Sequence, residues 1–292
     1  MEARRGELPH ARVHSIYIGG GTPSVLPPAL LHRILDRARA LYDVSDDAEV
    51  TVEMNPDDPV ERAPLRELNR VSLGIQTFDD TLLRLIRRRH DATTSIRAVK
   101  HLQAAGIANI SIDLIYGLPD QTLGQWERDL DIAFSLGIQH LSAYALSYEP
   151  GTALTRWRDE GRIRETPDEL SVQMYRRLCQ RAREAGFEHY EISNFALPGR
   201  EAIHNGAYWR RLPYVGLGPG AHSFDGKRRR SWNSEDLSDW QRTSETLTDE
   251  NVAMETLMLG LRTSEGLPAE WLRRHTDPSS LETLLADTKL RL

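Results

Sequence analysis

The sequence predicts an α/β fold in which a parallel sheet has helices packed on its outside. Three observations lead to this prediction. Apolar, β-branched segments alternate with amphipathic helical segments, five such repeats occupy residues 1–150, and glycine or proline separates many of them. Right-handed crossovers would curl this sheet into part of a barrel, and an open, doubly wound sheet is the alternative.

The individual elements follow from hydrophobic periodicity. In the first helical segment Leu31, Ile34, Leu35 and Ala38 recur at steps of three and four residues, which places them on one helical face. The expected strands are residues 13–19, 49–54, 70–76, 109–115 and 140–146. The expected helices between them are residues 27–41, 60–69, 79–88, 93–105 and 122–136.

The pattern changes after residue 150. A helix is expected at residues 167–184, a strand at 188–193 and a last helix at 253–262, with an irregular, glycine- and aromatic-rich stretch at 194–232. A loop of that length is functional or disordered, and the aromatic residues of this one favour function. Those aromatics are Phe195, Tyr208, Trp209 and Tyr214. The expected domains are residues 1–150 (partial barrel), 151–250 (trailing α+β segment) and 251–292 (start of a C-terminal helical region).

Composition limits the function classes. The chain has 292 residues and a formal net charge of −6, which suits a globular protein and argues against a general nucleic-acid surface. The basic run at residues 227–230 is expected to be a solvated loop. Neither a membrane-spanning apolar stretch nor a signal-peptide core is found, so a cytoplasmic location is expected.

Cysteine content restricts metal chemistry. Cys179 is the one cysteine of the chain, so this chain alone cannot form an internal disulfide or a site built from several cysteines. Its neighbours have a helical pattern, and a small buried hydrophobe is its expected role.

Residues 15–24, Ser-Ile-Tyr-Ile-Gly-Gly-Gly-Thr-Pro-Ser, give the main functional signal. A β-branched run breaks into three glycines, which allow positive φ and let a ligand approach the backbone closely. At the end of a parallel strand this loop is expected to cradle a ligand, and an ordinary βα turn is the alternative.

Polar groups also follow the next strands. They include amide donors, two carboxylates, a carboxamide and a guanidinium, which together suit a zwitterionic ligand that carries hydroxyls. Arg88 would take a carboxylate, and an acid would take an amine or ribose hydroxyls; each residue also has an ordinary structural explanation. In chain order the groups are Gly20, Gly21, Thr22, Glu53, Gln76, Arg88 and Asp113.

These segments resemble one family. The residues at 17–24, Glu-Met-Asn-Pro at 53–56, Leu-Gly-Ile-Gln-Thr-Phe at 73–78 and Asp-Leu-Ile-Tyr-Gly-Leu-Pro at 113–119 are similar to the radical S-adenosylmethionine (radical SAM) proteins related to oxygen-independent coproporphyrinogen III oxidase. Three later motifs resemble the haem chaperone branch of that family: Tyr-Glu-Ile-Ser-Asn-Phe-Ala at 190–196, His-Asn-Gly-Ala-Tyr-Trp at 204–209 and Gly-Leu-Gly-Pro-Gly-Ala-His-Ser at 216–223.

The resemblance implies a partial TIM-type barrel that lacks its first strand and carries a C-terminal α+β extension. It implies that the seven strand-end residues contact S-adenosylmethionine, and that the chain binds haem and transfers it to an acceptor protein. We hypothesise that His204 and His222 lie near the haem, because imidazole is a good axial ligand. No catalytic residue and no metal ligand is assigned.

One family feature is missing from this sequence. The family carries Cys-x3-Cys-x2-Cys ahead of the Gly-Gly-Gly-Thr-Pro segment, and these thiolates hold a [4Fe–4S] cluster. None of the residues before Ser15 is a cysteine. We therefore expect no cluster-dependent oxidase activity from this chain alone. The sequence is expected to be a fragment of a longer protein, with a degenerate, binding-only family member as the alternative.

Two other functions remain open at this stage. One is the oxidase itself, which acts in porphyrin biosynthesis, and the other is a metabolite-binding barrel that takes neither haem nor S-adenosylmethionine. The expected partner is a haem-acceptor protein. No nucleic acid and no membrane span are expected, although the chain could associate peripherally with a membrane during haem transfer.

Overall fold

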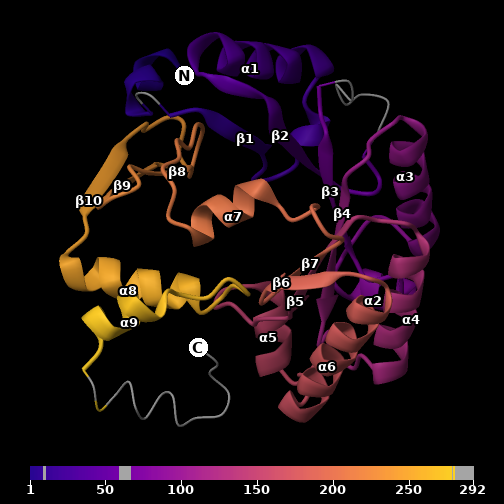
Figure 1. Cartoon of the computed structure of the whole chain (residues 1–292). Coiled ribbons are helices and arrows are strands. Elements are labelled where there is room, and N and C mark those ends of the chain that lie inside the picture. The colour runs from indigo at the N-terminus through magenta and orange to yellow at the C-terminus, as the bar shows by residue number, and fades with distance from the viewer. Residues whose placement is uncertain (9–10, 59–66, 278, 280–292) are drawn as a thin grey trace. The chain divides into compact units, whose positions relative to one another are not determined.

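Residues 1–8, 11–58, 67–277 and 279 are described by the computed structural model, which is drawn in Figure 1. The chain forms two compact units. The sheet unit comprises residues 12–204, and the terminal unit comprises residues 1–11 together with residues 205–292.

The sheet unit is built on a seven-stranded sheet with the strand order β1-β2-β3-β4-β5-β7-β6. Strands β1 to β5 are parallel, and β7 and β6 extend the sheet in antiparallel fashion. The α/β partial barrel expected from the sequence is therefore confirmed. The strands are β1 (Val13–Ile18), β2 (Val44–Met54), β3 (Arg70–Gln76), β4 (Ile110–Tyr116), β5 (His140–Ala145), β6 (Glu188–Glu191) and β7 (Asn194–Ala196).

Helices of the sheet unit largely follow the periodicity of the sequence. They are α1 (Pro28–Leu41), α2 (Asp80–Leu85), α3 (Ala92–Ala104), α4 (Leu123–Ser135), α5 (Ala153–Asp159) and α6 (Asp168–Glu184), and a short 3₁₀ turn, η2, covers Pro23–Val25. Helix α5 was not predicted. Helix α2 ends earlier than predicted because Arg87 adopts a positive φ of 58°. The helix expected at 60–69 falls mostly outside the described residues.

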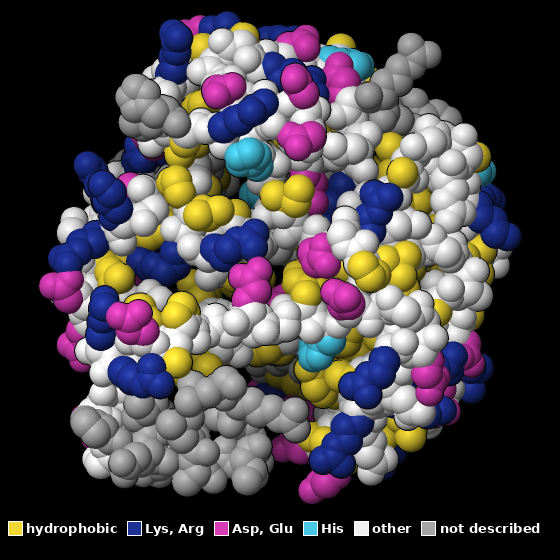
Figure 2. Space-filling model, in the orientation of Figure 1, with side chains coloured by type: hydrophobic (Ala, Val, Ile, Leu, Met, Phe, Trp, Pro, Cys, Tyr) yellow, Lys and Arg dark blue, Asp and Glu magenta, His cyan; other side chains and the backbone are white. Residues whose placement is uncertain are grey.

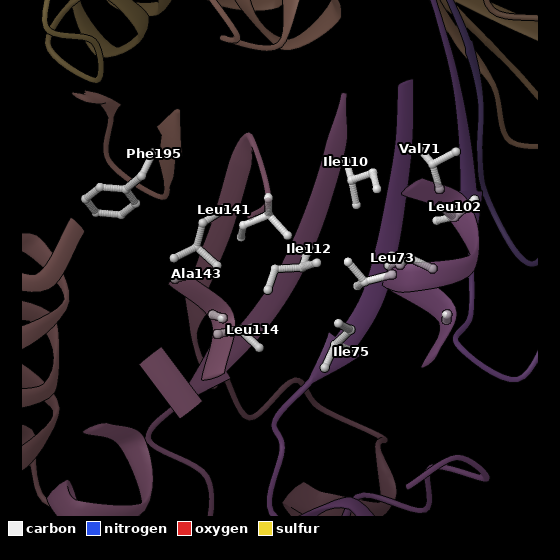
Figure 3. Close-up of a cluster of buried hydrophobic side chains, with 14 of the residues drawn as sticks. Val71, Leu73, Ile75, Leu102, Ile110, Ile112, Leu114, Leu141, Ala143 and Phe195 are labelled. Atoms are coloured by element: carbon white, nitrogen blue, oxygen red, sulfur yellow. The ribbon is translucent and has the colours of Figure 1, made fainter. Parts of the chain in front are cut away.

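One face of the sheet is apolar and forms the core with the helices. Figure 3 shows this cluster, in which side chains of β3, β4 and β5 lie beside one another. Alternate residues of a strand point to the same face, so a single periodic pattern supplies the whole layer. Leu102 of α3 and Trp126 of α4 are fully buried members of it. The strand residues include Val71, Leu73, Ile75, Ile110, Ile112, Leu114, Leu141 and Ala143.

Helix α6 also packs against this core, and Figure 1 shows α3, α4 and α6 along one side of the sheet. Cys179 lies in α6, partly buried among apolar neighbours, and burial raises the pKa of its thiol. The expected helical, hydrophobic role of this cysteine fits that position.

The terminal unit contains a three-stranded antiparallel sheet in the order β10-β9-β8. Its elements are η1 (Glu2–Glu7), β8 (His222–Phe224), β9 (Arg229–Asn233), β10 (Arg242–Thr246), α8 (Asp249–Gly260) and α9 (Ala269–His275). Helix α7 (Ile203–Trp209) begins in the sheet unit and continues into the terminal unit.

A carboxylate ties the first residues of the chain to the sheet of the terminal unit. Glu7 pairs with Arg4 at 2.8 Å and with Arg242 of β10 at 2.7 Å, and Arg4 also donates to Ser223 Oγ at 2.6 Å. The hydrogen bond from Arg4 is the largest cause that lowers the pKa of Glu7, to about 2.

Two expectations for the region after residue 190 need correction. The stretch expected to be irregular, 194–232, contains β7, α7, β8 and most of β9. The basic run at 227–230 is only in part a solvated loop, because Arg229 and Arg230 start β9 and Arg230 pairs with Glu255 at 2.7 Å. The domain limits expected at residues 150 and 250 stay a prediction.

One face of the molecule carries mixed charges. On the face shown in Figure 2, Lys and Arg side chains are interspersed with Asp and Glu side chains. Among the helices that the structure describes, none has the length and apolar content needed to cross a bilayer.

Candidate functional site on the polar face of the sheet

The face of the sheet opposite the apolar core is lined by polar side chains. Alternation within a strand puts Glu49, Thr51 and Glu53 of β2 on one face, while Val50 and Val52 point into the core. Neighbouring strands contribute polar residues at the same level, as their mutual contacts show. The polar face includes Ser15, Tyr17, Arg70, Ser72, Ser111, Asp113, His140 and Ser142.

Glu53 joins the glycine loop to this face. Its Oε2 accepts the backbone N–H of Gly20 at 3.0 Å, and its Oε1 accepts the hydroxyl of Tyr17 at 2.5 Å. A Cβ atom on Gly19 would lie 2.7 Å from the Glu53 carboxyl carbon and 2.5 Å from the Tyr17 ring. Only glycine fits at position 19, because these side chains close over the backbone there.

The next two glycines leave space for a ligand. Gly20 and Gly21 have φ of 78° and 94°, a backbone region that glycine adopts without strain. A Cβ atom on either would meet no described atom within 4 Å, and both residues are exposed. The backbone of this loop is therefore accessible to a ligand beside the Glu53 carboxylate.

Asn55 connects two further candidates. Its Nδ2 donates to Thr22 Oγ1 at 3.4 Å, and its Oδ1 accepts from Arg88 Nη1 at 3.4 Å. Burial lowers the pKa of Arg88, and the carboxylates of Asp57 and Asp113 oppose that effect. Asn55 was expected only to form a turn with Pro56, so its bridging position is a finding of the structure.

Asp113 is the most perturbed carboxyl of the candidate set. Burial is the largest cause, and it raises the pKa of Asp113 to about 6 against the hydrogen bonds from Ser142 and Ser72. The Ser72 hydroxyl lies 3.2 Å from Asp113 Oδ2, and the charge of Glu53 raises the pKa further. Asp113 is therefore close enough to Glu53 and Arg88 for their charges to interact.

Gln76 ends β3 in an unusual conformation. Its φ is 72°, and its amide Nε2 would lie 2.9 Å from a Cβ placed on Gly74, so the side chain folds back over that glycine. The following turn is held by Asp129 of α4, which accepts from Thr77 Oγ1 and from Phe78 N, each at 2.7 Å. The structure thus fixes the end of β3 at the edge where the other candidates lie.

His204 contacts the same polar face from the start of α7. Its ring stacks on Tyr17 with centroids 4.7 Å apart and an angle of 16°, and its Nδ1 lies 3.1 Å from Ser15 Oγ. The Glu49 carboxylate accepts the backbone N–H groups of Ile203 and His204, each at 3.1 Å. Burial lowers the pKa of His204 to about 4, so its imidazole is neutral at pH 7.

His222 belongs to the terminal unit and is exposed on β8. Its ring lies over Trp232 with centroids 6.0 Å apart. Within the same unit Tyr208 packs edge-on against Tyr214 at 4.7 Å, and the Arg262 guanidinium lies 4.5 Å from the Trp209 ring centroid. The two candidate histidines thus belong to different units, and each has an aromatic neighbour within its own unit.

Sequence reasoning missed a buried hydrogen-bond network deeper on the polar face. His140 Nδ1 lies 2.7 Å from Ser111 Oγ, and its Nε2 lies 2.8 Å from the Tyr190 hydroxyl. Burial lowers the pKa of His140 well below its usual value. The alternation of polar residues within β4 and β5 was the available signal for this network.

The residues fit one implied cofactor and not the other. Exposed glycine backbone, two carboxylates and a guanidinium match the groups of S-adenosylmethionine. For a [4Fe–4S] cluster the part of the chain that the structure describes offers no cluster of three His, Cys, Asp or Glu side chains able to hold a metal ion. The side chains that the structure describes therefore do not fit a cluster.

Comparisons with known proteins identify the family and the fold of the chain. Residues 2–133 match the family model of the radical SAM superfamily. The structure is similar to coproporphyrinogen III oxidase (HemN) from Escherichia coli, with a TM-score of 0.73 at 21% identity, over 90% of this chain and 68% of that one. At that identity the similarity shows the fold.

Similarity in sequence is stronger to proteins named heme chaperone HemW. The chain is 38% identical to the one from Synechocystis over 87% of this chain and 66% of the relative, and 36% identical to the one from Bacillus subtilis over 87% and 70%. The relative from Mycobacterium tuberculosis is 34% identical over 98% of this chain and 77% of the relative. The chain thus spans about two thirds of the length of the first two relatives. These matches show that the chain belongs to the HemW family of radical SAM proteins.

Proposed function

We propose that this chain binds haem and S-adenosylmethionine and serves as a haem chaperone that passes haem to an acceptor protein. Membership of the HemW family supports the haem part of this proposal. The observation that carries the S-adenosylmethionine part is the position of Glu53, which accepts from Gly20 N–H while Asp113 and Arg88 lie near enough to interact electrostatically.

Each part of S-adenosylmethionine has a partner in this proposal. Arg88 takes the carboxylate, because a guanidinium binds carboxylates through paired hydrogen bonds. Glu53 and Asp113 take the amine and the ribose hydroxyls, and the backbone at Gly20 and Gly21 allows close approach. Bound there, the compound would supply a sulfonium-linked adenosyl group.

Haem is the cargo in this proposal, and His204 is its proposed axial ligand. A neutral imidazole offers a nitrogen lone pair to iron, and the pKa of His204 near 4 keeps the ring neutral over the physiological range. His222 is the second proposed haem-proximal residue, on the evidence of its aromatic neighbour Trp232.

Location and partners are proposed with the function. The chain is proposed to act in the cytoplasm, with peripheral membrane association during transfer, on an acceptor protein that binds haem more tightly. No nucleic-acid partner is proposed.

Ligand titrations of the full chain test the proposal. We expect S-adenosylmethionine to bind by calorimetry and hemin to bind with a Soret band. Glu53→Gln is expected to weaken the binding of S-adenosylmethionine, and His204→Ala is expected to weaken the binding of hemin. His101→Ala, at an exposed position of α3, is the matched control and is expected to leave both unchanged. Binding of neither ligand would favour the metabolite-binding barrel instead.

The fold shared with HemN keeps the oxidase as a second candidate. An assay for conversion of coproporphyrinogen III separates the two functions. We expect no protoporphyrinogen from this chain, because its described side chains do not fit the cluster that the reaction requires.

A further inference from the structure

Tyr17 touches both proposed ligand sites at once. Its hydroxyl donates to Glu53 Oε1 at 2.5 Å, and its ring stacks on His204 at 4.7 Å with nearly parallel planes. All three residues belong to the sheet unit. One rigid side chain therefore connects the acid proposed for S-adenosylmethionine with the histidine proposed for haem.

The position of the Tyr17 ring depends on Glu53. Behind both side chains lies Gly19, where even a Cβ atom would approach the ring to 2.5 Å and the carboxyl carbon to 2.7 Å. The ring thus packs directly on the backbone beside the carboxylate. A change in the direction of the carboxylate consequently moves the hydroxyl that is bonded to it.

Glu53 has hydrogen-bond partners on both oxygens. Oε2 accepts from Gly20 N–H and Oε1 accepts from Tyr17. A ligand amine or hydroxyl that approaches this carboxylate must share or replace one of these donors. We take the Tyr17 hydroxyl as the donor that leaves, because it sits on a side chain that can turn about its own bonds and the residue is 36% exposed, so the hydroxyl can bond to water instead.

We propose that Tyr17 couples the two sites: a ligand that takes Glu53 as its acceptor displaces the Tyr17 hydroxyl, and the loosened ring releases His204 for iron. This inference rests on the proposed function and adds regulation to it. A coupling free energy between two ligands is reciprocal, so haem that draws His204 away from Tyr17 equally favours ligand binding at Glu53. Couplings of this kind typically change affinity by about 5- to 150-fold.

The experiment is a hemin titration of the full chain, followed at the Soret band, with and without saturating S-adenosylmethionine. In the parent we expect hemin to bind about fivefold or more tightly when S-adenosylmethionine is present. Tyr17→Phe removes the hydroxyl that the ligand at Glu53 would displace, so the ring has no bond to Glu53 with or without S-adenosylmethionine. Both ligands should still bind, while the ratio of affinities falls to one.

Tyr175→Phe is the matched control. That residue is another tyrosine of the sheet unit, whose hydroxyl lies 3.3 Å from His189 Nε2 and whose side chain packs against the apolar core. Its removal is expected to leave the affinity ratio at the parent value. A fall in this variant as large as in Tyr17→Phe would show a general effect of losing a hydroxyl and would overturn the inference.

A second measurement needs no haem. With isotopically labelled histidine, S-adenosylmethionine is expected to shift the ring resonances of His204 in the parent and leave them unmoved in Tyr17→Phe. The signal is assigned by its loss in His204→Ala.

The outcomes separate the two proposals. Two outcomes would show that the coupling is wrong while the proposed function stands. In the first, both ligands bind to the parent but S-adenosylmethionine does not change its affinity for hemin. In the second, S-adenosylmethionine raises the hemin affinity of Tyr17→Phe as much as that of the parent. If Glu53→Gln and His204→Ala leave their ligands unaffected, the proposed function itself is wrong, and the coupling falls with it.

Discussion

The two faces of the seven-stranded sheet differ in what they require of the sequence. The face toward α3, α4 and α6 is filled by apolar side chains that only need to pack, and the opposite face holds carboxylates, serines and histidines that need specific partners. Because alternate residues of the same strands supply both, the fold and the chemistry are specified by interleaved but largely separate sets of residues.

Asp129 and Asp113 illustrate the difference between the two faces with residues of the same type. Burial raises the pKa of each to about 6. Asp129 lies on the helix side and is held by Thr77 and the backbone of Phe78, which makes it a structural brace. Asp113 lies on the polar face, where it accepts from Ser72 and interacts with the charge of Glu53, at the site proposed for S-adenosylmethionine.

The largest expected effect is on the apolar face. Trp126 is fully buried and donates from Nε1 to Met174 O at 2.9 Å. Trp126→Ala removes this bond and leaves a large cavity, so we expect the free energy of unfolding to fall by about 3–5 kcal/mol. Urea denaturation followed by circular dichroism measures it. A loss below about 1 kcal/mol would contradict the view that packing on this face determines stability.

A smaller effect tests the raised pKa of Asp129 through the pH dependence of stability. Asp129 has a pKa near 6 in the folded protein and near 3.8 in the unfolded chain, so the folded state binds its proton more tightly. The free energy of unfolding of the parent therefore falls as the pH rises from 4 to 6. Asp129→Asn removes this dependence. Relative to the parent, the variant should gain on the order of 2 kcal/mol between pH 4 and pH 7.

Denaturation at several pH values tests this prediction, with Asp91→Asn as the control because that exposed aspartate has its pKa lowered and should show the opposite trend. Parallel pH profiles of the parent and Asp129→Asn would refute the assignment.

The smallest expected effect is on the polar face. Ser72→Ala removes a hydroxyl that hydrogen-bonds to Asp113, so the pKa of Asp113 should rise above about 6 while the free energy of unfolding changes by about 1 kcal/mol or less. Carboxyl NMR titration measures the pKa. An unchanged pKa would mean that Ser72 does not stabilise the ionised form of Asp113.

Regular elements were predictable from the sequence because each repeats one periodic pattern. The strand at 70–76 was predicted with its observed limits, and the helix at 27–41 matches α1 within a residue. Short elements lacked that signal. Helices α5 and α7 have seven residues each and strands β7 and β8 have three, too few for a period to emerge.

The candidate site was predictable only in its strand-end residues. The glycine loop and Glu53 follow from their place after strands, and the structure brings them into contact. The role of Tyr17 beyond its place in a strand was not predictable, because local sequence patterns do not reveal contacts between distant residues. Its partner Glu53 lies 36 residues away along the chain, and His204 lies farther still. Arg87 likewise has a distant partner, because its guanidinium packs 4.6 Å from the centroid of Trp157 in the unpredicted helix α5.

The pairing of Glu7 with Arg242 has a consequence for the order of folding. During synthesis the sheet unit can form as soon as residue 204 has left the ribosome, since its contacts lie within residues 12–204. Glu7 must wait for a partner that is translated 235 residues later. Residues 1–7 can therefore complete these contacts only late in synthesis, and a ribosome that stalls before β10 would leave Glu7 paired with Arg4 but without Arg242.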